Sequence, residues 1–227
     1  MTDAPRRRAF DRGPRPLLRG HLHANAAWYF GGTSTALVVS AFALAGIGWL
    51  SLATTIYALL LVAMLSVSAL YHRFPWRSEA AVAAWRRADH AMIALFIAGT
   101  YGPVLLGAST SAHTLFTLGV AWVAAIAAVI LNIVWITHPR WMSVSIYLLL
   151  GWIGLADITS LATRLSTATL ILILSGGAVY TAGAISYALK RPNFSERWFG
   201  FHEVFHAATI IAAGIHHVAV WLTVLGS

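Results

Sequence analysis

Seven long apolar stretches follow one another along the chain, separated by shorter polar segments. They cover residues 26–47, 50–72, 89–106, 112–135, 141–160, 168–189 and 201–225. A helix needs about 20 mostly apolar residues to cross the hydrocarbon core of a bilayer. None of these stretches alternates with the period of two residues that a membrane β-barrel requires. The pattern therefore predicts an all-α integral membrane protein, built as a seven-transmembrane-helix bundle.

The first 25 residues differ from the rest of the chain, because they carry six arginines and three prolines. We expect a basic, flexible N-terminal tail (1–25) followed by a single transmembrane domain (26–225). The tail has no short apolar run ending in a small-residue cleavage site, so it is not expected to be a signal peptide. Such a tail can lie on an anionic membrane surface. A charge block that only sets the topology explains it equally well.

The basic residues also predict how the helices are oriented. If seven helices alternate direction, 14 of the 15 Lys and Arg residues fall on the side of the N-terminus and only Arg164 falls on the other. Positive charge collects on the cytoplasmic side of membrane proteins. We therefore expect a multi-pass protein of the inner (plasma) membrane, with the N-terminus in the cytoplasm and the C-terminus outside.

Composition supports the membrane assignment and narrows the possible partners. The chain is 59% hydrophobic and 10% charged, whereas soluble domains carry about 25% charged residues. The net charge of +8 is explained by topology, so no nucleic-acid partner is expected. There is no cysteine, so a metal site would have to use His, Asp or Glu.

The last apolar stretch opens with His202-Glu203-Val204-Phe205-His206. Two histidines four residues apart lie on the same face of a helix, one turn apart, and can bind one metal ion. Zn²⁺ is the commonest choice for imidazole ligands. Alternatively, the two side chains simply meet water or lipid headgroups at the start of the helix.

Three further polar residues are expected at the same depth of the membrane. His72 and Ser68 close the second stretch, and Asp89 opens the third. Three histidines and a water would complete a catalytic zinc site, which keeps one position open. The Asp89 carboxylate could orient that water or accept its proton, and Ser68 could hold a water or a substrate carbonyl.

Each of these residues also has a purely structural explanation. Asp89 could be the N-cap of its helix, His72 could extend toward the interface, and Ser68 could bond to a carbonyl of its own helix. His216 and His217 lie about 15 Å along the helix from His206 at 1.5 Å per residue, and we expect them to serve packing or hydrogen bonding.

The same five residues also fit the pattern HExxH, in which the glutamate is the general base of zinc proteases. Glu203 is then a candidate base, and Asp89 could supply a third ligand from another helix. The longer pattern, with a third histidine six residues later, fails because position 212 is alanine. Glu203 could instead face the lipid headgroups.

Taken together, these motifs resemble those of the progestin and adipoQ receptor family, and most closely its bacterial branch of hemolysin III-like proteins. The resemblance extends over all seven stretches, and its motifs are Ser68–His72, Asp89-His90, residues 97–103 and His202–His206. It implies a seven-helix fold with a cytoplasmic N-terminus. It also implies zinc held by His72, His202 and His206, with Asp89 acting through a bound water and Ser68 nearby.

The wider superfamily includes alkaline ceramidases, and this suggests a zinc-dependent hydrolase of a lipid amide or ester. A membrane lipid would be its substrate or ligand. Two other functions remain open: a non-catalytic receptor-like sensor or pore-forming cytolysin with structural zinc, and an intramembrane metalloprotease. The sequence does not determine the oligomeric state.

Overall fold

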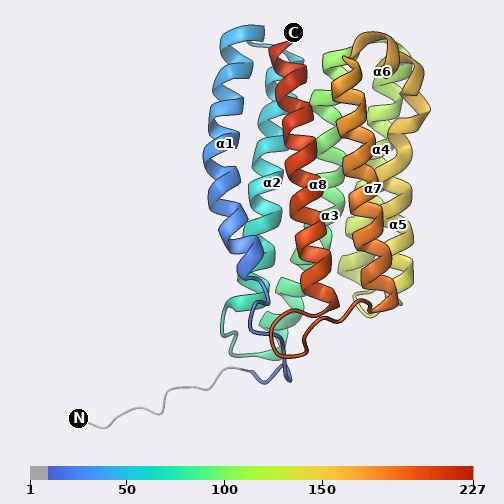
Figure 1. The fold of residues 1–227 in the computed structure, drawn as a ribbon. Helices are drawn as coiled ribbons and strands as arrows, with labels where there is room; N and C mark the ends of the chain where they lie inside the picture. The colour runs from blue at the N-terminus through green and yellow to red at the C-terminus, as the bar shows by residue number, and fades with distance from the viewer. Residues whose placement is uncertain (1–9, 227) are drawn as a thin grey trace.

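The computed structural model describes residues 10–226, which form a bundle of roughly parallel helices (Figure 1). In chain order the elements are α1 (His21–Ala45), α2 (Trp49–Arg73), α3 (Glu79–Ala108), α4 (Ala112–Val134), α5 (Arg140–Trp152), η1 (Ile153–Asp157), α6 (Ile158–Arg164), α7 (Thr167–Leu189) and α8 (Phe201–Leu225). The elements α5, η1 and α6 together make one span, Arg140–Arg164. Seven segments of the described chain are thus long and apolar enough to cross a membrane. This confirms the predicted fold class. Arg6, Arg7 and Arg8 of the predicted tail lie outside the described residues.

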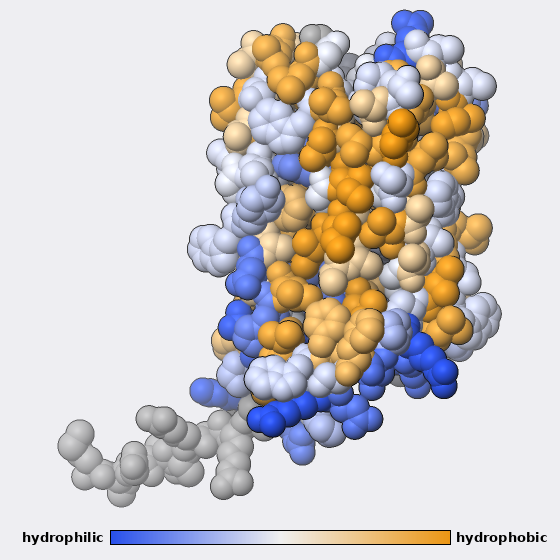
Figure 2. Space-filling model, in the orientation of Figure 1, coloured by the Kyte–Doolittle hydropathy of each residue, from blue (hydrophilic) through white to orange (hydrophobic). Residues whose placement is uncertain are grey.

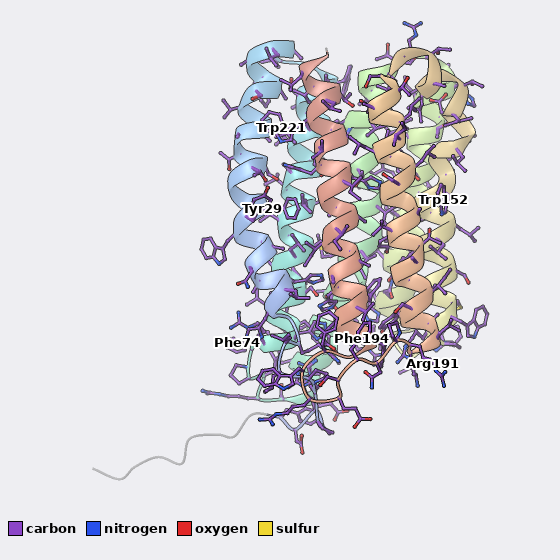
Figure 3. The ribbon with its side chains drawn as sticks, in the orientation of Figure 1. Tyr29, Phe74, Trp152, Arg191, Phe194 and Trp221 are labelled. Atoms are coloured by element: carbon purple, nitrogen blue, oxygen red, sulfur yellow. The ribbon has the colours of Figure 1, made fainter. Side chains whose placement is uncertain are left out.

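The two ends of the bundle differ in chemistry. We call the end at which α1 begins the proximal end and the opposite end, where α8 finishes, the distal end (Figure 1). Apolar side chains cover much of the face drawn in Figure 2, and polar ones gather at the proximal end. Figure 3 shows Phe74, Arg191 and Phe194 near the proximal end, and Trp221 nearer the distal end.

Two helices begin earlier than the hydrophobic pattern predicts. The start of α3 is Glu79 rather than residue 89, because Ser78 caps the helix by accepting a hydrogen bond from the Ala81 backbone N–H at 3.2 Å. Asp89 therefore lies inside α3, and the N-cap explanation for this residue is wrong. The start of α1 is His21, so residues 21–25, which were expected in the tail, are helical.

The helices pack closely where small residues face a neighbour. A Cβ atom placed on Gly183 of α7 would lie 2.5 Å from the Ala208 Cβ of α8, and one on Gly176 would lie 2.4 Å from the His216 ring. Small residues at such contacts let transmembrane helices approach each other. Elsewhere, neighbouring helices in the chain pack against each other: α1 against α2, α2 against α3, and α3 against α4. In addition, α1 packs against α8.

The helix of the fifth span is interrupted within the span, toward its distal half. Its helix changes to a 3₁₀ turn at Ile153–Asp157, where backbone groups lose their regular partners. The Tyr101 hydroxyl of α3 compensates, because it lies 2.8 Å from the Leu150 carbonyl and accepts from the Gly154 N–H at 3.2 Å. Non-helical backbone is tolerated inside a membrane only where its polar groups are satisfied in this way.

Candidate metal centre

Three histidines meet at the proximal end of the bundle. His72 comes from the last turn of α2, and His202 and His206 come from the first two turns of α8. One nitrogen from each ring can be chosen such that all three lie within 4.8 Å of one another. The ring centroids are 4.6–5.0 Å apart. Residues about 130 positions apart in sequence are brought together because α2 ends where α8 begins.

The hydrogen bonding of these rings fits a metal ligand set. Both ring nitrogens of His72 and Nδ1 of His206 are buried without a hydrogen-bond partner among residues 10–226. Buried polar atoms are nearly always paired, so unpaired ones indicate a missing partner such as an ion or a water. Three neutral imidazoles are a donor set that suits Zn²⁺. The cluster could therefore hold a metal ion.

Asp89 of α3 lies next to this cluster. Its Oδ2 is 3.8 Å from Nε2 of His72, and the side chain of Ser68 lies beside its carboxylate. Both residues are buried. The structure thus brings Ser68 and Asp89 to the three histidines, at the depth that the topology predicts.

Glu203 has a different environment from the other candidates. It is fully buried, with Oε2 accepting a hydrogen bond from the Gly200 N–H at 2.9 Å and Oε1 forming an ion pair with Arg19. These contacts cap the start of α8 and attach the N-terminal segment to it. Both carboxylate oxygens already have partners. Glu203 does not face the lipid headgroups.

A fourth histidine, which lies within the segment 1–25 that was expected to be a tail, also belongs to this region. The ring of His23 in α1 stacks on His206, with centroids 3.9 Å apart and planes 12° apart, and it is only 3% exposed. A metal lies in the plane of the imidazole that binds it, so two parallel rings at this separation cannot bind one ion. His23 therefore forms a wall of the site. The signal in the sequence was that residues 21–25 contain no helix breaker.

Residues 10–20, which we call the N-terminal arm, lie across the proximal end. Arg12 and Arg15 donate to the backbone carbonyls of Tyr71 and His72, at 2.6 and 3.1 Å. The Leu17 N–H donates to the Arg197 carbonyl at 2.9 Å. The arm joins α1 at Gly20, whose φ of 78° is left-handed and where a Cβ would lie 2.7 Å from the His72 Cβ. Glycine is needed there on both counts.

The arm concentrates positive charge over the histidines. Burial, followed by the charges of Arg12 and Arg19, lowers the pKa of Arg15 from its usual value. Because that usual value lies above 12, Arg15 remains charged at neutral pH. Without a metal, neutral imidazole rings avoid the charge repulsion that these arginines would exert on protonated rings.

A cavity of about 340 Å³ opens beside the histidines. It lies between α3, α5, α7 and α8, and most of its lining is apolar. Ser68, Asp89, His202 and His206 line it, whereas Glu203 does not. Its volume falls within the range of small-molecule sites. The candidate centre thus faces a space that can accept an apolar ligand.

The remaining histidines of α8 lie toward the distal end and have protein partners. Nε2 of His216 lies 3.0 Å from the Ile173 carbonyl. For His217, Trp221 Nε1 donates to Nε2 at 3.3 Å, so Nδ1 carries the proton and donates to the Tyr57 hydroxyl at 3.2 Å. These contacts agree with the expected packing and hydrogen-bonding roles.

The fold and the cluster define a multi-pass membrane protein with a candidate metal centre at one end of a seven-helix bundle. The sequence matches the family described as Haemolysin-III related over residues 12–217. The chain therefore belongs to this family, which confirms the resemblance to hemolysin III-like proteins.

Two curated relatives are similar to about half of the chain. The "Hemolysin-3 homolog" of Bacillus subtilis (strain 168) is 30% identical over 119 residues, 52% of this chain and 53% of the relative. "Hemolysin-3" of Bacillus cereus is 30% identical over 118 residues, 52% of this chain and 51% of the relative. The chain thus spans about half the length of the curated relatives it matches.

Proposed function

We propose that this protein is a zinc-dependent membrane hydrolase that cleaves a lipid amide or ester. The observation that carries the proposal is the position of the three histidines, two of which, His202 and His206, line a largely apolar cavity together with Asp89. Catalytic zinc sites commonly use three protein ligands and leave one position open. The two histidines of α8 and Asp89 are therefore placed where the polar end of a lipid would enter.

In this proposal His72, His202 and His206 hold the metal. When bound, zinc supplies a Lewis acid and makes a water molecule a stronger acid. Asp89 is the general base, because its Oδ2 lies 3.8 Å from Nε2 of His72 and therefore close to any water at the centre. The adjacent Ser68 orients the carboxylate. The apolar cavity holds the hydrocarbon chain and keeps bulk water from the reacting carbonyl.

We also propose that the proximal end faces the cytoplasm. All described Lys and Arg residues except Arg164 belong to the proximal side of the alternating spans, and Arg164 ends α6. This distribution follows the positive-inside rule. The metal centre would then lie near the cytoplasmic face of the inner membrane.

The first experiment is elemental analysis of the purified protein, for the wild type and for His72→Ala. We expect about one zinc per chain in the wild type and much less in the variant, since three ligands complete a catalytic site. Hydrolysis of ceramide and of a monoacyl ester would then be measured with and without a chelator. Zinc binding without chelator-sensitive hydrolysis of either lipid class would contradict the enzymatic proposal.

Pore formation is a second candidate, because both relatives are named as hemolysins. Among the described residues most of the unpaired buried polar groups lie toward the proximal end, and the lining of the cavity is mostly apolar, which favours lipid binding over a water-filled channel. Dye release from liposomes by the purified protein, insensitive to chelators, would favour the pore instead.

The third candidate is an intramembrane metalloprotease with Glu203 as its general base. It requires that Glu203→Gln abolish cleavage, yet both carboxylate oxygens of Glu203 already have partners.

A further inference from the structure

Two cavity-lining residues outside the candidate metal centre are joined by a hydrogen bond. His138 lies in the loop between α4 and α5, and Ser143 lies in the first turn of α5. Nε2 of His138 is 2.5 Å from the hydroxyl oxygen of Ser143. Both side chains line the cavity, and neither residue is among the three histidines of the candidate centre. The pair is therefore a separate chemical feature of the same cavity.

The second ring nitrogen of His138 determines which tautomer is present. Nδ1 lies 2.5 Å from the carbonyl oxygen of Trp135, which can only accept a hydrogen bond. In the neutral ring Nδ1 therefore carries the proton, and Nε2 keeps a free lone pair. Consequently the Ser143 hydroxyl donates its hydrogen bond to Nε2. A nucleophilic serine and its histidine base have this arrangement, and a third group, here a backbone carbonyl, orients the base.

Other serine hydroxyls of the described chain have different partners. The hydroxyl of Ser175 in α7 donates to the Leu172 carbonyl of its own helix at 3.2 Å, and the hydroxyls of Ser111 and Ser166 cap α4 and α7. These are the usual local roles of serine in helical proteins. Within residues 10–226, Ser143 is the one serine whose hydroxyl is hydrogen-bonded to a histidine. Its hydroxyl is thus held against a base rather than used to complete a helix.

The start of α5 provides positive potential next to this hydroxyl. The N-cap of the helix is Pro139, and no side chain caps it. The first backbone N–H groups of a helix have no carbonyl partner within that helix, and the helix dipole places partial positive charge there. Ser143 belongs to this first turn. Negative charge that develops on a carbonyl oxygen bound at Ser143 is therefore stabilised by the helix.

The lining around the pair specifies the kind of molecule that would react. His138 and Ser143 are 7% and 8% exposed, so bulk water has little access to them. Next to Ser143 the lining continues with Val144 and Leu148 of α5, and Leu174 of α7 lines the same cavity. An apolar acyl chain is removed from water in such a space. A carboxylic ester with an apolar acyl chain therefore fits both the lining and the nucleophile.

We propose that Ser143 and His138 form a second, metal-independent catalytic pair that hydrolyses esters of apolar carboxylic acids. Oγ of Ser143 attacks the ester carbonyl carbon while its proton passes to Nε2 of His138. The bond between that carbon and the alcohol oxygen then breaks, and the alcohol leaves with the proton. Water attacks the acyl-serine in the same way, its proton passing through Nε2 to Oγ, which releases the acid and restores the hydroxyl. This activity goes beyond the proposed zinc-dependent function and does not depend on it.

The first test is covalent labelling of Ser143 by an alkyl fluorophosphonate, which loses fluoride to an activated serine hydroxyl. The full chain is labelled in a neutral detergent with a chelator present, and peptide mass spectrometry locates the label. We expect about one phosphonyl group per chain, on Ser143, because activation requires the histidine base. Ser143→Ala should remain unlabelled. Ser175→Ala, at a serine that does not line the cavity, should be labelled like the wild type. Absence of the label from Ser143 in the wild type would overturn the proposal.

The second test separates this activity from the zinc-dependent one. Hydrolysis of p-nitrophenyl octanoate is followed with and without a chelator. We expect a rate that the chelator does not change and that falls by at least about 10³-fold in Ser143→Ala, as on loss of a nucleophile. If the rate depends on the metal and not on Ser143, this inference alone fails. If it depends on Ser143 while no lipid is cleaved in a chelator-sensitive way, the proposed function alone fails.

A cysteine variant tests the role of His138 even if Ser143→Ala disturbs the loop before α5. The chain contains no cysteine, so Ser143→Cys introduces a single thiol. Its rate of alkylation by iodoacetamide as a function of pH reports the thiolate, whose usual pKa is about 8.5 and which a neighbouring histidine lowers. We expect the midpoint of this pH profile to lie at least about one pH unit lower than in the double variant that also carries His138→Gln. Equal midpoints would show that His138 is not a base for this position and would overturn the proposal.

Discussion

The proximal and distal ends of the bundle both bury histidine and aspartate side chains, but the hydrogen-bond partners of these side chains differ between the two ends. At the distal end His217 is hydrogen-bonded through both nitrogens, and Oδ2 of Asp157 accepts from the Thr114 hydroxyl at 2.8 Å. Oδ1 of Asp157 has no hydrogen-bond partner among the described residues but lies 3.7 Å from Nε2 of His113. At the proximal end both nitrogens of His72 and one of His206 lack partners within the described chain. Residue type alone therefore does not identify a site. The grouping of several unpaired ring nitrogens within reach of one ion does, and the described residues show it at the proximal end.

The largest expected effect is a difference in zinc content between variants of two histidines on the same helix, His206 and His217. We expect His206→Ala to remove the zinc from the protein, from about one ion per chain to nearly none, because a three-ligand site does not survive the loss of one ligand. His217→Ala should keep the zinc. Elemental analysis of both variants measures this difference. Zinc retained in His206→Ala, or lost in His217→Ala, would break the comparison.

His217→Ala should instead lower stability. It leaves the Tyr57 hydroxyl and the Trp221 indole N–H without their partner, which costs about 1–3 kcal/mol per buried group. Thermal unfolding in detergent would report this loss, and it provides the matched control for the metal measurement.

The next effect compares two aspartates. Asp89→Asn should lower the rate of lipid hydrolysis by about 10²–10⁴-fold, the usual contribution of a general base. Zinc content should stay at the wild-type level, since Asp89 is not among the three proposed ligands. Asp157→Asn should leave the rate unchanged, because this carboxylate bonds to Thr114 at the other end of the bundle. Steady-state hydrolysis of the same lipid by the three proteins tests the assignment, and equal rates for Asp89→Asn and wild type would remove Asp89 as the base.

The smallest effect concerns the stacked ring of His23. Removing a stacked aromatic partner costs about 0.5–1.5 kcal/mol beyond its buried area. His23→Ala should therefore weaken zinc binding by about 2–10-fold. His23→Phe keeps a flat ring against His206 and should bind zinc within about twofold of the wild type. Competition with a chromogenic chelator gives the affinities. Equal weakening in both variants would show that the nitrogens of His23 matter rather than its stacking.

Much of the fold could be predicted because lipid imposes a simple rule on the sequence. Each span must be apolar over a fixed length, and the span Phe201–Leu225 is predicted to the residue. The convergence of His72 with His202 and His206 follows from alternation alone, since even-numbered spans end where odd-numbered ones begin.

The sequence did not reveal where α1 and α3 begin, because in both helices polar residues continue the helix beyond the apolar region. The segment Glu79–Ala88 is helical but carries Arg86 and Arg87, so the hydropathy pattern places the start of this span too late. His23 was missed for the same reason, because α1 begins within the polar segment. The partners of Glu203 are properties of side-chain packing, and no local pattern encodes them.

The order of the helices also determines when the centre can exist during biosynthesis. His72 is near the end of the second span, whereas His202 and His206 belong to the last span, which packs against α1. Chains are synthesised from the N-terminus, so the first six spans can be inserted before any pair of ligands on α8 has been made. A chain without α8 therefore has only one of the three histidines of the candidate centre. All three come together only after α8 has been inserted, so metal binding at this cluster would report that insertion of α8 is complete.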